Sequence, residues 1–154
     1  MLSDSSLIAK PLIQSSWIIC CAPKYLENKE APNNPQELST HNCLAYTYQA
    51  EGAYDWRFTQ NQQEFCIKIS GNFTTNNSQA LRKAALAGYG IVYVPRCSVY
   101  EDLQKGDLIP LLTQYKARSL GIYAVYPYTR HQPQKIKLLI EHLKKAYLAK
   151  AQYF

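Results

Sequence analysis

Four neighbouring polar residues, Thr74, Thr75, Asn76 and Asn77, have the clearest potential for binding chemistry in this sequence. Together with Ser78 they offer hydroxyl, amide and backbone N–H groups, and they include neither a carboxylate nor a lysine. Asn77 or Ser78 stands where a helix needs an N-cap. Because a helix N-terminus carries partial positive charge and unpaired donors, it favours an anion such as a carboxylate or phosphate. From the residues alone, the more ordinary interpretation is that they only cap a helix and turn the chain, because most polar caps have no other role.

The segments on either side of this loop predict how it is positioned. An apolar strand at 66–70 precedes it, a helix at 78–87 follows, and Gly88 suits the left-handed position past a helix end. The next segment, 91–95, is apolar almost throughout, as expected of a parallel strand buried on both faces. A strand–helix–strand unit of this kind crosses over right-handedly, and ligands of open α/β sheets bind at the carboxyl ends of the strands. The sequence therefore places the loop at a ligand-binding edge.

Signatures of catalysis are weak. The sequence has no G-x-S-x-G elbow, no phosphate loop with G-K-[ST] and no H-E-x-x-H motif. Glu51 and Asp55 flank a glycine-containing turn and are more typical of solvated carboxylates than of an acid/base pair. Cys97 follows Pro95 and Arg96 near a helix start, where a thiol pKa could fall, but no base is identifiable beside it. These patterns argue against an enzyme.

The cysteines and histidines predict neither a metal site nor a disulfide framework. The cysteine count is odd, no C-x-x-C pair occurs, and each cysteine lies in or beside an apolar stretch; they are Cys20, Cys21, Cys43, Cys66 and Cys97. Buried, reduced thiols in a cytoplasmic protein explain this pattern best. His41, His131 and His142 are far apart and lack metal-ligand spacing. We therefore expect no cofactor and no metal.

The formal charge of +6 comes largely from lysines in the C-terminal segment, where Glu141 is the one acidic residue among them. Such a cluster could touch nucleic acid or an acidic membrane, but a solvated helix face is the more ordinary interpretation. No apolar run is long enough for a membrane helix, and the N-terminus does not have the pattern of a secretory signal. We therefore expect no membrane partner and a cytoplasmic location.

The remaining segments predict an α/β protein. Apolar β-type segments lie at 16–23, 44–48, 108–112 and 117–127, and a helix is expected to begin at Pro133. The apolar residues of that helix follow helical spacing and need a packing partner; they are Ile136, Leu139, Ile140, Leu143 and Tyr147.

Three short segments are the most specific parts of the sequence: A-P-x-Y-L at 22–26, A-L-x-x-A-A-L-A-G-x-G-I at 80–91 and A-V-Y-P at 124–127. With these segments in this order, the sequence resembles the effector-binding domain of LysR-type transcriptional regulators. Each segment is weak alone, but their order and spacing match the family from about residue 4 to residue 148. The resemblance implies the fold of type 2 periplasmic binding proteins, in which two α/β lobes joined by two crossing strands hold an effector in the cleft.

The resemblance also implies how the chain is divided. We expect residues 1–14 to be the end of the first lobe with a crossover strand, 15–118 to be a complete second lobe, and 119–154 to be the return crossover and a C-terminal helix of the first lobe. The family's DNA-binding helix-turn-helix has no counterpart here, as in an isolated domain or a truncated reading frame. Specific DNA binding would then occur only through that missing N-terminal domain.

By the same resemblance, the second lobe contributes to the effector site with the loop before the helix at 78–87 and the loop after the strand at 91–95. These correspond to Thr74, Thr75, Asn76 and Asn77, and to Pro95 and Arg96. The expected partner is a small-molecule effector, anionic and carboxylate in type, and the parent regulator is expected to be a homo-oligomer.

Two other classes of protein share this fold. A solute-binding protein would be exported, which the missing signal sequence and the cysteines argue against. An enzyme such as a small dehydratase would need an acid/base pair converging on the cleft, and the sequence offers none.

Overall fold

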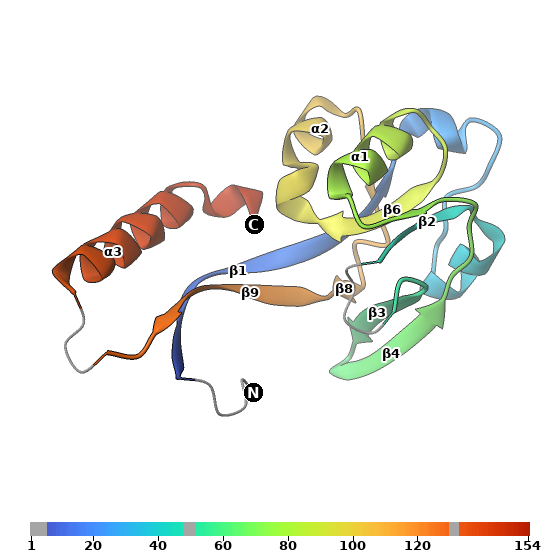
Figure 1. The fold of residues 1–154 in the computed structure, drawn as a ribbon. Coiled ribbons are helices and arrows are strands. Elements are labelled where there is room, and N and C mark those ends of the chain that lie inside the picture. The colour runs from blue at the N-terminus through green and yellow to red at the C-terminus, as the bar shows by residue number, and fades with distance from the viewer. Residues whose placement is uncertain (1–5, 48–51, 130–132) are drawn as a thin grey trace. The chain divides into compact units, whose positions relative to one another are not determined.

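The structure is a computed structural model that describes residues 6–47, 52–129 and 133–154 (Figure 1). Its strands are β1 (Leu7–Cys21), β2 (Cys43–Tyr46), β3 (Asp55–Gln60), β4 (Gln63–Lys68), β5 (Thr74–Thr75), β6 (Ile91–Pro95), β7 (Ile109–Leu111), β8 (Lys116–Ala117) and β9 (Ser119–Pro127). Its α-helices are α1 (Ser78–Leu86), α2 (Tyr100–Lys105) and α3 (Gln134–Ala149). Short 3-10 helices lie at Pro23–Leu26, Pro35–Thr40, Arg96–Ser98 and Ala151–Tyr153. The predicted α/β class is confirmed.

The main sheet is mixed and not wholly parallel. Its strands follow the order β5-β2-β6-β1-β7, and β9 also pairs with β1. The strands β5 and β6 both run parallel to β2, whereas β1 runs antiparallel to both β6 and β7. The apolar sequence of β6 predicted burial correctly, because its residues from Ile91 to Val94 are all buried. β6 is buried on both faces although only one of its two neighbouring strands, β2, runs parallel to it.

The strand expected before α1 was assigned to the wrong sheet. β4 forms a hairpin with β3, with Trp56 opposite Ile67, and belongs to a separate sheet of order β4-β3-β8. The strand that enters α1 is instead β5, a two-residue segment formed by Thr74 and Thr75, which we expected to be loop. The chain reaches it by running along β2, where the N–H of Cys43 donates to the carbonyl of Ser70. The crossover unit is therefore β5-α1-β6.

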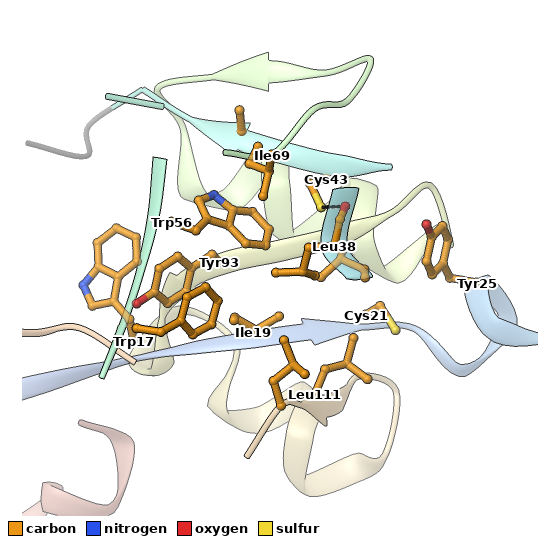
Figure 2. Close-up of a cluster of buried hydrophobic side chains, with 14 residues drawn as sticks. Trp17, Ile19, Cys21, Tyr25, Leu38, Cys43, Trp56, Ile69, Tyr93 and Leu111 are labelled. Atoms are coloured by element: carbon orange, nitrogen blue, oxygen red, sulfur yellow. Dashed lines mark hydrogen bonds between the residues drawn. The ribbon is translucent and has the colours of Figure 1, made fainter. Parts of the chain in front are cut away.

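Both faces of the main sheet are buried along β2, β6 and the second half of β1, where alternate residues face opposite layers. On one face, Ile19 and Tyr93 belong to a cluster that includes Trp56 and Phe58 from β3 (Figure 2). On the other face, Val92 and other strand residues pack with residues of α1, and Leu103 of α2 packs against the same cluster. The buried members of this cluster are Cys20, Ala22, Leu44, Leu81, Ala85, Val92, Val94, Val99 and Leu108. The small sheet thus covers one face, and the helices cover the other.

The chain divides into two compact units, unit 1 (Met1–Ser15 with Ser119–Phe154) and unit 2 (Ser16–Arg118). Both buried clusters belong to unit 2. In unit 1, the backbone N–H of Tyr128 donates to the carbonyl of Ser6, 2.6 Å away. The assignment of these units to lobes of a larger fold stays a prediction.

Helix α3 follows Pro133, as expected, and its apolar stripe is unevenly covered: Ile140 is buried, Ile136, Leu143 and Tyr147 are half-buried, and Leu139 is exposed. Ile140 is 6% exposed, whereas Leu138 and Leu139 are 54% and 56% exposed. Within the described ranges, no helix is long and apolar enough to cross a membrane.

The cysteines differ in exposure, contrary to the expectation that all are buried. Cys20, Cys21 and Cys43 are buried, and Cys66 and Cys97 are exposed. Cys66 lies in β4, whose residues alternate between partly buried and exposed, so an apolar neighbourhood in the sequence did not imply burial. The thiols' redox state stays a prediction.

Candidate functional site

The register of the main sheet brings the two predicted site segments to one edge. β2 pairs in parallel with β5, placing Tyr46 opposite Thr75, and in parallel with β6, placing Leu44 opposite Val92. Because the three strands run in the same direction, their carboxyl ends emerge together. Thr75 and Pro95 therefore end strands at the same edge, which we call the carboxyl edge.

The N-terminus of α1 lies at this edge and already has a cap. The side-chain oxygen of Asn77 accepts hydrogen bonds from the N–H groups of Gln79 and Ala80, at 2.9 and 3.2 Å. The N–H of Asn77 in turn donates to the Thr75 hydroxyl, 3.2 Å away. The capping interpretation is thus correct for Asn77. The helix dipole still favours an anion here, but two of the first-turn donors are already bonded.

The other predicted residues of this loop differ in their surroundings. The Thr74 hydroxyl lies 2.7 Å from the hydroxyl of Tyr54, so this side chain interacts with the segment before β3. Asn76 and Asn77 are exposed, and Thr75 is half-buried. The loop therefore presents amides to solvent beside the end of β5, without any carboxylate that would repel an anion.

Arg96 directly follows β6 and begins a short 3-10 helix, Arg96–Ser98. The turn is closed by the Ser98 hydroxyl, which donates to the carbonyl of Pro95 at 2.7 Å. The Nε of Arg96 is buried and, within the described residues, has no hydrogen-bond partner. A buried charged donor without an acceptor is uncommon in proteins, and it makes Arg96 a candidate binding residue.

A second guanidinium, that of Arg118, lies near the same edge and was missed by sequence reasoning. Trp17 pairs with Pro95 across β1 and β6. The Arg118 guanidinium carbon lies 4.8 Å from the centre of the Trp17 ring, in a cation–π contact. Trp17 also packs edge-on against Tyr93, with ring centres 5.4 Å apart (Figure 2). No local motif marks Arg118, because its partner lies about a hundred positions away in the sequence.

Tyr93 joins the two sheets of unit 2 at this place. Its hydroxyl donates to the carbonyl of Arg57 in β3, 2.8 Å away, and accepts from the N–H of Arg118, 2.6 Å away. The position of Arg118 is therefore fixed by a residue in the middle of the buried cluster.

The family assignment agrees with this architecture. The LysR substrate binding domain family matches residues 2–148, nearly the whole chain. This chain belongs to that family. It is a LysR regulatory domain, a class that binds small-molecule effectors and is not enzymatic.

Curated relatives of this LysR domain are named as transcriptional regulators. An uncharacterized HTH-type transcriptional regulator of Haemophilus influenzae is 33% identical over 135 residues, covering 88% of this chain and 46% of the relative. The HTH-type transcriptional activator TtdR of Escherichia coli is 32% identical over 136 residues, covering 88% and 44%. The LysR domain described here spans about half the length of these relatives.

Solved structures confirm the fold class. The regulatory domain of CrgA, a LysR-type regulator from Neisseria meningitidis, superposes with a TM-score of 0.80 at 29% identity, covering 95% of this chain and 71% of that one. Full-length AphB, the Vibrio cholerae virulence activator, gives a TM-score of 0.79 at 28% identity, covering 93% and 49%.

An ion pair fixes the helix that carries the capped loop of this LysR domain. Arg82 of α1 binds Asp102 of α2 with two hydrogen bonds, Nε to Oδ2 at 2.5 Å and a terminal N–H to Oδ1 at 2.6 Å. The Asp102 side chain is 4% exposed, and hydrogen bonding to it raises the pKa of Arg82. The N-terminus of α1 is thereby positioned relative to α2.

The weaker catalytic candidates do not form a site. Glu51 lies outside the described residues, as does His131, and Asp55 begins β3. Cys97 is exposed in the turn after Arg96. Among the residues that the structure describes, no group of three potential metal ligands comes together.

Proposed function

We propose that this domain senses a small organic anion, a carboxylate, at the carboxyl edge of β5, β2 and β6. Thr74, Thr75, Asn76 and Asn77 form one side of the proposed site, and Pro95 and Arg96 form the other. The observation that carries the proposal is the buried Arg96 Nε without a hydrogen-bond acceptor. A carboxylate is the natural partner, because it accepts two parallel hydrogen bonds from a guanidinium.

The surroundings of Arg96 favour a bound anion, and not an acidic side chain of the protein, as its counter-ion. The neighbouring loop is free of acidic residues from Gly71 to Ala80. The N-terminus of α1 contributes a favourable partial charge. With a net charge of +6, the chain as a whole also attracts anions.

For the whole regulator, we propose that effector binding in this domain controls DNA binding by a separate helix-turn-helix region. Its curated relatives, of which this chain covers about half, are named as HTH-type regulators. We further propose a homo-oligomeric regulator that acts in the cytoplasm. Membership of the LysR family disfavours the alternative of an exported solute-binding protein.

The test is titration of the chain with acetate, succinate, benzoate and sulfate, followed by calorimetry and by amide chemical shifts. We expect at least one carboxylate to shift the amides of residues 74–78 and 95–98. Arg96→Gln should weaken that binding by about tenfold or more, since hydrogen bonds to charged groups contribute about 1.5–3 kcal/mol.

The matched control is Lys105→Gln, which removes the same charge at the C-terminal end of α2. This end leads into β7, which starts at the opposite edge of the sheet because β7 and β6 are both antiparallel to β1. The proposal is wrong if carboxylate binding is equally sensitive to both substitutions, or insensitive to Arg96→Gln.

A further inference from the structure

A pocket of about 230 Å³ lies within unit 2, beside β1 and next to the end of β6. It combines one cation with a mainly apolar wall; its lining residues are Ser16, Trp17, Ile18, Ile19, Arg96, Leu111, Leu112, Thr113, Tyr115 and Ala117. None of these lining residues is acidic. The pocket thus adjoins the proposed anion site through the residue shared by both, Arg96.

The apolar wall is pre-formed and well buried. Ile19, Leu111 and Leu112 are 3%, 8% and 6% exposed, and Trp17 is 6% exposed. An apolar cavity of about 150 Å³ is large enough to bind benzene. A pocket of 230 Å³ therefore has room for a six-membered ring and a carboxylate.

Leu112 gives a second, independent sign of a specialised wall. Its backbone φ is +54°, in the left-handed region that a bulky residue rarely adopts. The turn is held by the N–H of Tyr115, which donates to the Leu112 carbonyl at 2.9 Å. Strained backbone of this kind is concentrated at ligand-binding sites, where the surrounding structure enforces it. Here it places Tyr115 and Leu112 together on the pocket wall.

We infer that the effector is an aromatic monocarboxylate, whose ring occupies this pocket while its carboxylate binds Arg96. The inference rests on the proposed function and refines it by naming the ligand class. The carboxylate supplies the acceptor that the Arg96 Nε lacks, and the ring contacts Trp17, Tyr115 and the aliphatic wall. Since Asn77 already occupies two donors of α1, the carboxylate lies toward Arg96.

The experiment compares benzoate with acetate on the 154-residue chain by calorimetry, with amide shifts to locate binding. Benzoate should bind at least tenfold more tightly than acetate, because the ring adds buried apolar surface. Arg96→Gln should weaken benzoate by tenfold or more. Thr113→Trp, at an exposed position of the pocket rim, should weaken benzoate by tenfold or more while changing acetate affinity less than twofold.

Ala117→Leu is a second pocket-filling variant, and thermal melting checks that each variant remains folded. If benzoate and acetate bind equally, or if neither pocket-filling variant changes the affinity for benzoate, the aromatic ligand class is wrong. In either case, weaker binding in Arg96→Gln would still support an anion site. If benzoate binding responds to Thr113→Trp but not to Arg96→Gln, the pocket is only an apolar cavity and the inference is wrong. If acetate and benzoate both fail to bind while succinate binds through Arg96, the proposed function stands and the aromatic ligand class is wrong. If sulfate alone binds, both the proposed function and the ligand class are wrong.

Discussion

The two units of this chain treat their large apolar side chains differently. In unit 2, Trp56, Phe58 and Tyr93 are at most 1% exposed, and they sit between two sheets. Unit 1 leaves many such side chains open to solvent; they include Leu7, Leu120, Tyr123, Val125, Tyr128, Leu138, Leu139 and Leu148. Both units have the periodic apolar pattern of ordinary strands and helices. The comparison shows that sequence periodicity identifies the apolar side chains on one face of an element. Whether those side chains are buried depends on tertiary packing, which the periodicity does not reveal.

The largest expected effect comes from truncating a core side chain of unit 2. Phe58→Ala should lower the free energy of unfolding by about 3–5 kcal/mol, because it removes a ring stacked between Phe65 and Tyr93. Leu120→Ala in β9 is the matched change in unit 1, where the side chain is 42% exposed. Its cost should stay within about 0.5 kcal/mol. Chemical denaturation measures both, and equal costs would contradict the contrast between units.

The ion pair between α1 and α2 extends the comparison to polar contacts. Arg82→Met should cost about 3–5 kcal/mol, because it leaves the buried Asp102 carboxylate without its partner. The control is Glu64→Gln, which removes a pair with Arg57 whose side chains are 47% and 73% exposed. That change should cost less than about 1 kcal/mol. A small effect of Arg82→Met would mean that Asp102 finds another partner or water.

Tyr93→Phe tests how strongly the Tyr93 hydroxyl fixes the backbone of Arg118, the last residue of unit 2. The substitution keeps the ring but removes the hydroxyl that serves Arg57 and Arg118. We expect a loss of about 1–3 kcal/mol, since two backbone groups lose a partner. Tyr123→Phe in β9, where the ring is 50% exposed, should be nearly neutral. In amide exchange, protection should fall at Arg118 in Tyr93→Phe; unchanged protection there would contradict the link.

The exposed leucines of α3, Leu138, Leu139 and Leu148, should affect association more than stability. We expect the double variant Leu139→Lys and Leu143→Lys to reduce self-association, because exposed apolar patches promote it. The Leu139→Lys change alone should alter the free energy of unfolding by no more than about 0.5 kcal/mol, because Leu139 is 56% exposed. The half-buried Leu143 adds a larger cost than Leu139. Analytical ultracentrifugation and denaturation measure the two quantities. Unfolding of the double variant, with a stable monomeric parent, would show that the stripe is already covered.

The smallest expected effect is a pH dependence in unit 2. Burial, and then the charge of Lys29, lower the pKa of His41 below its usual value near 6.5, while Glu37 opposes the shift. The Tyr25 hydroxyl accepts from the N–H of Asn42 and lies 3.2 Å from the His41 Nδ1, a contact that suits a neutral ring.

Because the folded pKa of His41 is depressed, the unfolded chain takes up its proton first as pH falls below about 6.5. His41 therefore removes stability in that range, and His41→Gln should lose less stability than the parent between about pH 7 and pH 5. Denaturation at several pH values measures this, and the same pH dependence of the free energy of unfolding in both proteins would exclude this role.

Local features of the fold could be predicted from the sequence. Asn77 caps α1, and Gly88 adopts a φ of +78° past the end of that helix, as their positions predicted. These features depend on a few neighbouring residues. Sheet membership could not be predicted in the same way, because Thr74 and Thr75 form a strand only through pairing with β2.

The candidate site shows the same division. The Thr74–Asn77 loop and Arg96 stand out in sequence because their chemistry lies next to recognisable element ends. Arg118 and Trp17 do not, since their contact joins the two ends of unit 2. The exposure of Cys97 and Cys66 was mispredicted for a related reason, because apolar neighbours in sequence need not be neighbours in space.

The two adjacent buried thiols of β1 can serve as probes of local opening in unit 2. Cys20 and Cys21 are consecutive in a strand, so they point into opposite layers, one toward the helices and one toward the small sheet. Burial raises the pKa of Cys20 strongly and that of Cys21 to about 12, so neither reacts until its own layer opens. The rates at which a thiol reagent labels Cys20 and Cys21 would therefore report how often each layer opens, measured at two adjacent positions of one strand.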